Sequence, residues 1–270
     1  MHSLTFVPMI LAFALSAAVF DVLAAIFVWR GGSERTDRAL AALAILLHAA
    51  ALTHQVFHGG SITIGVNEAV SLFAWQSALL LWAFCWKEPL RGLGVMIYPF
   101  AGFWAVWAAL LPTPVSTMPI ADWKIRTHIL LSLLSAGVLT LAAVQAGALA
   151  LQDRFLHHPR NGHVLQGLPP LQTMERLLFQ LIGVGFFLLS LTLLSGLWFI
   201  RDWLAQHLAH KTILSVTAWL TFGVLLWGRW RYGWRGRTAI RWALSGYGIL
   251  ILAYFGSKLI LEQILGEHWS

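Results

Sequence analysis

The sequence has little charge and almost no cysteine. Only 11% of its 270 residues are charged and 59% are hydrophobic, with a mean hydropathy of +0.73. A soluble domain carries about 25% charged residues, so this composition excludes an ordinary water-soluble enzyme and is typical of membrane proteins. Cys85 is the single cysteine. The chain can therefore form no internal disulfide, no thiol relay and no CxxC metal or CxxCH haem-attachment site.

Catalytic motifs are missing as well. The sequence contains no P-loop, no GxGxxG, no HExxH and no Gly-x-Ser-x-Gly elbow. Without a nucleophile, a base dyad or a cofactor loop, it predicts a protein that is not an enzyme. The net charge of +7 comes from basic residues in short connections between apolar segments, including the run Trp227–Arg237. That placement indicates contact with lipid headgroups rather than with nucleic acid.

Long apolar runs make up most of the chain. Their lengths and flanking residues predict an all-α, polytopic transmembrane bundle of about eight spans, forming a single integral membrane domain. The predicted spans are residues 4–29, 39–57, 66–86, 93–111, 125–151, 171–200, 212–227 and 243–265. No basic region precedes the first span, which favours a retained helix over a cleaved signal peptide.

Basic residues are shared unevenly between the two sides of these spans. Of the eighteen Lys and Arg residues, most follow the first, third, fifth and seventh spans: Arg30, Arg35, Arg38, Lys87, Arg91, Arg154, Arg160, Arg176, Arg229, Arg231, Arg235, Arg237 and Arg241. By the positive-inside rule this side is cytoplasmic, so both termini are predicted to be extracytoplasmic.

Histidines gather at the predicted outer side. Five of them come from three separate segments: His54, His58, His128, His207 and His210. Neutral imidazole is a good axial ligand for haem iron, and ligands on opposite faces of the macrocycle must come from different elements. Trp198 and Trp203 lie near the same level. These tryptophans could cover a porphyrin or act only as interfacial anchors, and the histidines could equally be solvated residues of outer loops.

Two ionisable residues lie deeper in the predicted spans. Asp21 precedes Arg30 by nine residues, and His48 follows Arg38 by ten. At ~1.5 Å per residue, both lie about 13–15 Å from the cytoplasmic edge. Ionisable groups at that depth are costly and normally have a partner. We expect an Asp21–His48 pair in which the carboxylate orients an imidazole that ligates a metal or passes a proton. The alternative is a single structural hydrogen bond between helices.

Four segments between residues 40 and 255 carry a family resemblance. They are Phe57-His-Gly-Gly with Val66–Trp75, His128-Ile-Leu-Leu-Ser-Leu-Leu-Ser, Leu168-Pro-Pro-Leu-Gln-Thr-Met-Glu-Arg176, and His210-Lys211 with Trp219 and Gly233-Trp-Arg-Gly-Arg237. Because these segments occur in this order, the chain resembles the cytochrome c assembly membrane proteins (CcsA, CcmC, CcmF), and most closely their short HemX/YpjD-like branch.

The resemblance implies a multi-pass protein of the bacterial inner (plasma) membrane that handles non-covalently bound haem during cytochrome c maturation. It implies His128 as an axial ligand and other maturation proteins as partners. Haem-delivery members carry a tryptophan-rich outer segment ending in Asp-Pro-Lys-Glu, whereas Gly196–Lys211 keeps only Trp198, Trp203 and the lysine. The second outer histidine of those members is missing from Tyr254–Lys258.

Several functions stay open at this point. A haem-binding or haem-translocating protein would use His128 with His54 or His210 opposite, and His48 is a candidate for a lower site. A non-haem regulatory or accessory subunit, acting on haem synthesis or on an ion transporter, would retain the fold without the site. A proton- or ion-coupled transporter rests only on Asp21 and His48, and the broken-helix signals of transporters are missing.

Overall fold

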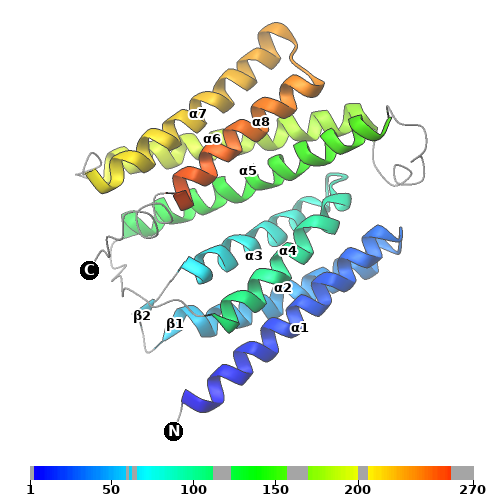
Figure 1. Cartoon of the computed structure of the whole chain (residues 1–270), viewed down its shortest axis with the longest axis vertical. Helices are drawn as coiled ribbons and strands as arrows, with labels where there is room; N and C mark the ends of the chain where they lie inside the picture. The colour runs from blue at the N-terminus through cyan, green and yellow to red at the C-terminus, as the bar shows by residue number, and fades with distance from the viewer. Residues whose placement is uncertain are drawn as a thin grey trace. The chain divides into compact units, whose positions relative to one another are not determined.

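The chain is helical in two compact units. The computed structural model describes residues 3–58, 61–62, 66–111, 123–156, 170–199 and 206–256. Within these ranges, α1–α4 belong to unit 1 and α5–α8 belong to unit 2 (Figure 1). The predicted helical membrane bundle is confirmed. That the two units form a single integral domain stays a prediction.

Unit 1 contains four helices and a small hairpin. The helices are α1 (Ser3–Trp29), α2 (Glu34–Val56), α3 (Val66–Phe84) and α4 (Gly94–Leu110), the last preceded by a 3-10 turn at Arg91–Leu93. Strands β1 (Phe57–His58) and β2 (Ser61–Ile62) pair antiparallel. α1 packs against α2 and α4, and α3 packs against the same two helices. Ala14, Ala51 and Ala105 are buried where α1, α2 and α4 meet, because small side chains let membrane helices approach closely.

Unit 2 repeats this packing order. Its helices are α5 (Trp123–Leu156), α6 (Leu171–Phe199), α7 (Gln206–Tyr232) and α8 (Gly236–Ile251), and α8 continues into a π-helical turn at Leu252–Gly256. α5 packs against α6 and α8, and α7 packs against the same two helices. The shared order emerges only in three dimensions, since no repeat of fixed period is evident in the sequence.

Six segments of the described chain are long and apolar enough to cross a membrane: Pro8–Trp29, Glu34–Val56, Arg91–Leu110, Trp123–Phe155, Leu171–Trp198 and Lys211–Tyr232. α3 and α8 occupy the places of the third and eighth predicted spans. α3 carries Asn67, Glu68 and Gln76, which make it more polar, and the α-helical part of α8 has 16 residues. Residues 257–265 of the eighth predicted span lie outside the described part.

Several helices extend beyond the predicted limits. α2 begins at Glu34 rather than residue 39, α7 ends at Tyr232 rather than 227, and α8 begins at Gly236 rather than 243. Hydropathy marks the lipid-facing part of a helix, whereas Arg and Glu continue the backbone hydrogen bonding as good helix formers. α7 ends where Gly233 takes a φ of 67°, a left-handed conformation that glycine adopts without steric cost.

One glycine permits a close helix contact in unit 1. A Cβ placed on Gly102 in α4 would lie 2.9 Å from the Cα of Ala18 and 3.3 Å from the Cβ of Asp21, both in α1. Real Cβ atoms do not approach backbone carbon so closely. Glycine at this position therefore sets the spacing of α1 and α4 beside the buried Asp21.

Candidate functional site

His128 lies in the second turn of α5 and is held by α6. Its Nδ1 is 2.9 Å from the Oγ of Ser195. The neighbouring Gly196 makes room for the ring, since a Cβ there would lie 3.2 Å from the Cε1 of His128. The imidazole is half-buried, and its Nε2 has no hydrogen-bond partner among the residues that the structure describes. The ring is thus anchored through one nitrogen and leaves the other available.

Polar contacts around His128 join three helices of unit 2. The Ser195 hydroxyl donates to the carbonyl of Thr192 at 2.8 Å. On α5, the Ser132 hydroxyl donates to the carbonyl of His128 at 2.7 Å, and the carbonyl of Ser132 accepts from the Tyr254 hydroxyl at 3.1 Å. Tyr254 lies in the π-helical turn after α8. These bonds tie the start of α5 to α6 and to the end of α8.

The structure describes only some of the other residues predicted for the outer site. In unit 1, the His54 ring stacks on Phe13 of α1, with centroids 6.1 Å apart and an interplanar angle of 3°. Trp198, the last residue but one of α6, is 87% exposed. Trp203 lies outside the described residues. His58 falls in β1 and His207 and His210 in the first turns of α7, but their side chains are outside the description, so the convergence of these histidines stays a prediction.

The deeper pair expected from the sequence takes other contacts. His48 is buried, and its Nε2 lies 2.9 Å from the Oγ of Ser71 on α3. Asp21 is also buried but packs against Gly102 of α4, and its Oδ1 has no hydrogen-bond partner among the described residues. The structure thus joins His48 to Ser71 rather than to Asp21. The physical reason is that α2 presents His48 toward α3, whereas α1 presents Asp21 toward α4.

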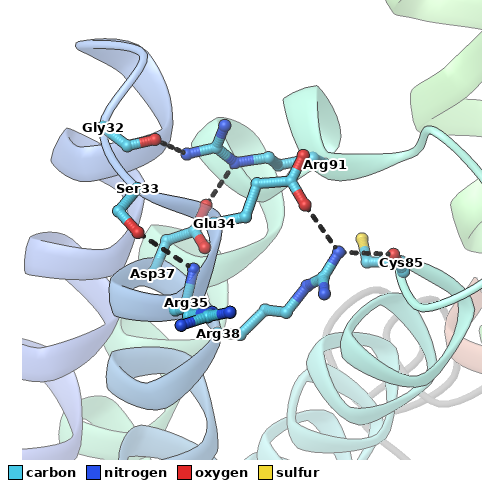
Figure 2. Close-up of polar contacts among 8 residues, drawn as sticks. All are labelled: Gly32, Ser33, Glu34, Arg35, Asp37, Arg38, Cys85 and Arg91. Atoms are coloured by element: carbon cyan, nitrogen blue, oxygen red, sulfur yellow. Dashed lines mark hydrogen bonds and ion pairs between the residues drawn. The ribbon is translucent and has the colours of Figure 1, made fainter.

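At one end of unit 1, arginines bind the turns between helices (Figure 2). Arg91, before α4, pairs with the buried carboxylate of Asp37 and donates to the carbonyl of Gly32 at 2.6 Å. Arg38 pairs with Glu34 at 2.9 Å and donates to the carbonyl of Cys85 at 3.2 Å. The α1–α2 turn and the α3–α4 turn therefore meet at the same end of the unit.

A matching arrangement holds unit 2. Glu175, near the start of α6, accepts hydrogen bonds from the Gly236 backbone N–H at 2.6 Å and from the Nε of Arg235 at 3.0 Å. Arg237 pairs with Asp153 of α5 at 2.9 Å. Two of the segments that carried the family resemblance, around Glu175 and around Arg235, are thus in direct contact. In each unit the arginine-rich turns share one end, as the alternating topology requires.

Sequence reasoning missed the residues that orient the imidazoles. Ser195 and Gly196 for His128, and Ser71 for His48, are small residues in apolar helices and carry no signal of their own. The available hint was their type, because Ser and Gly in membrane helices often mark a contact between helices.

Comparisons with known proteins fit this architecture. The model of the family described as Cytochrome C assembly protein matches residues 37–265. Inner membrane protein YpjD of Escherichia coli (strain K12) is 32% identical over 241 residues, covering 87% of this chain and 89% of the relative. A 28.8 kDa protein encoded in the nifR3-like 5' region of Azospirillum brasilense is 32% identical over 211 residues, covering 76% of this chain and 75% of the relative.

A more distant similarity covers part of the chain. Cytochrome c biogenesis protein CcsA of Thermosynechococcus vestitus is 29% identical over 107 residues, covering 39% of this chain and 34% of the relative. No solved structure matches. The predicted location in the inner membrane as a multi-pass protein is confirmed. By the family match along most of its length, the chain belongs to the cytochrome c assembly protein family.

Proposed function

We propose that this protein binds haem through His128 and acts in the biogenesis of cytochrome c. Membership of the cytochrome c assembly family supports a role in cytochrome c biogenesis. The observation that carries the haem assignment is the hydrogen bonding of the two ring nitrogens of His128. His128 is oriented through Nδ1 by Ser195, while Nε2 has no hydrogen-bond partner in the described part of the chain. A histidine that binds a metal through one ring nitrogen usually hydrogen-bonds a neighbouring group through the other.

The residues around His128 suit the chemistry of that cofactor. Haem supplies an iron that accepts imidazole nitrogen and changes oxidation state, with a potential set by its axial ligands and their hydrogen bonds. Gly196 lets the His128 ring lie close against α6, and the exposed indole of Trp198 at the same end of α6 is available to a flat apolar ligand. His128 would hold the iron, and Ser195 would hold His128.

A second axial ligand would come from another helix. His54 and His210 are the two candidates from the sequence. His48 is the candidate from the sequence for a separate, lower site, and in unit 1 it is buried with its Nε2 2.9 Å from the Oγ of Ser71. We further propose that the protein catalyses no bond-making step. It would reside in the lipid bilayer and act together with other cytochrome c maturation proteins.

Visible spectroscopy of the purified protein tests this proposal. The full chain in detergent is titrated with haemin, and the Soret band of the wild type is compared with that of His128→Ala. We expect a shifted Soret band and at least tenfold weaker binding for this variant. His157→Ala is the matched control and should bind as the wild type does, because His157 follows the fifth predicted span and so lies on the predicted cytoplasmic side. His54→Ala tests the second ligand separately.

Two results would overturn the proposal. A Soret band of added haemin that the protein leaves unchanged would favour the non-haem accessory subunit, in which the fold is kept and the site has no ligand. A normal band that His128→Ala leaves unchanged would place the ligand elsewhere in the chain.

A further inference from the structure

The hydroxyl of Ser195 has two close polar neighbours, and its own chemistry decides how they are bonded. A serine hydroxyl has one proton to donate and can accept hydrogen bonds through its oxygen. Its Oγ is 2.8 Å from the carbonyl oxygen of Thr192 and 2.9 Å from the Nδ1 of His128. The Ser195 hydroxyl donates its single proton to the carbonyl of Thr192, so its oxygen is left to accept. The contact with His128 must then use a proton on Nδ1.

This assignment fixes where the imidazole carries its proton. A neutral imidazole has one N–H, so a proton on Nδ1 leaves Nε2 with an exposed lone pair. If the proton were on Nε2 instead, the lone pairs of Nδ1 and of Ser195 would face each other while Ser195 still donated to Thr192. The Thr192 carbonyl also accepts a hydrogen bond from the ring of His128 itself, and a carbonyl can accept only from a protonated ring nitrogen.

The three groups are held by regular secondary structure. Thr192 and Ser195 are three residues apart on α6, so they share one face of the helix. Thr192 is buried, and its own hydroxyl donates to the carbonyl of Leu188 at 2.9 Å. The adjacent Gly196 allows the ring of His128 to lie against the backbone of α6. The bonding pattern is thus set by the helix and not by a loop.

We propose that Ser195 is a positioning residue that holds His128 as the Nδ1–H tautomer and so presents Nε2 as a metal ligand. Its use for haem rests on the proposed function of His128, but the tautomer itself does not require haem. Orienting groups of this kind change metal affinity by about 10–100-fold when they are removed. Ser195 would therefore tune haem affinity without touching the haem.

Nuclear magnetic resonance of the haem-free protein tests the tautomer directly. Side-chain ¹⁵N and ¹³C shifts of labelled histidine distinguish Nδ1–H from Nε2–H, and the signal of His128 is assigned by its loss in His128→Gln. We expect the Nδ1–H form in the wild type and a shift toward Nε2–H in Ser195→Ala. Ser190→Ala is the matched control, because Ser190 lies on the same helix and accepts from the Nε1 of Trp219 at 2.8 Å. Ser195→Thr should keep the wild-type tautomer.

Haemin titration of the same variants separates this inference from the proposed function. If both hold, Ser195→Ala binds haemin about tenfold more weakly, while Ser190→Ala and Ser195→Thr bind normally. If the wild type shows the Nδ1–H form but binds no haemin, the tautomer assignment stands and the haem proposal fails. If the wild type shows Nε2–H, or if Ser195→Ala leaves the tautomer unchanged, the role of Ser195 is refuted, whatever the haemin result. A wild type in the Nε2–H form refutes the inference even if Ser195→Ala does not fold.

Discussion

Replacement of Glu175 by alanine should destabilise unit 2 more than any other loss of a single carboxylate at its arginine-rich end. Glu175 is 9% exposed and accepts from the first backbone N–H of α8, at Gly236, as well as from Arg235. A carboxylate at a helix N-terminus satisfies an otherwise unpaired N–H and interacts favourably with the helix dipole. Its removal leaves that N–H without a partner.

The magnitude follows from these two contacts. Loss of a helix-capping side chain costs about 0.5–2 kcal/mol, and a hydrogen bond to a charged group contributes about 1.5–3 kcal/mol. The side chain of Arg235 is 57% exposed, so solvent screening limits its share to at most about 1 kcal/mol. We therefore expect Glu175→Ala to lower the free energy of unfolding by about 2–3 kcal/mol. At roughly 2–4 °C per kcal/mol for a chain of this size, the melting midpoint falls by about 4–12 °C.

Asp153→Ala is the matched control. Asp153 also pairs with an arginine, but the side chains of Arg237 and Asp153 are 69% and 30% exposed. Exposed pairs contribute about 0–1 kcal/mol, so the midpoint should fall by at most about 4 °C. The apparent midpoint in detergent is measured by intrinsic fluorescence, for which the fifteen tryptophans of the chain provide the signal. Equal shifts for the two variants would refute the reasoning, because the contact with the start of α8 would then contribute nothing.

Two further predictions concern helix spacing and topology. Gly102→Ala should lower the melting midpoint, because the new Cβ would press into the backbone of α1. Gly147→Ala is the control and should leave the midpoint equal or slightly higher, because no atom lies within 4 Å of its new Cβ. A larger loss for Gly147→Ala than for Gly102→Ala would contradict the close contact of α1 and α4. With Cys85 replaced by serine, a membrane-impermeant maleimide should label Leu111→Cys in intact cells and Lys87→Cys only after permeabilisation. Labelling of Lys87→Cys from outside would invert the proposed sidedness.

Helix positions were largely predictable from the sequence, but their ends were not. The starts of α3, α4 and α6 agree with prediction to within one residue. Several of the ends that differ are rich in arginine or glutamate, as at the end of α7 and the start of α8. Hydropathy reports where a helix meets lipid, and a helix can continue into water when its residues favour helix formation. The backbone geometry at Gly233, and not hydropathy, ends α7.

The candidate site was predictable only in part. The residue type and the predicted sidedness gave five outer histidines, and the family resemblance singled out His128 among them. Ser195 lies 67 residues away and bonds to it, and the sequence offered only the general hint of a small residue in a membrane helix. The deeper prediction shows the same limit, since equal depth suggested Asp21 for His48 and the structure places Ser71 there.

The sequence by itself determined that this protein is a bundle of membrane helices, and it predicts that most of the arginines lie on one side of the membrane. It could do so because an apolar helix satisfies its backbone hydrogen bonds within itself, so a span is a local property of about 20 residues. Only the tertiary structure decided which polar side chains meet, such as Glu175 with Arg235 or His128 with Ser195. Those choices depend on how each helix is rotated against its neighbours, which local sequence does not specify.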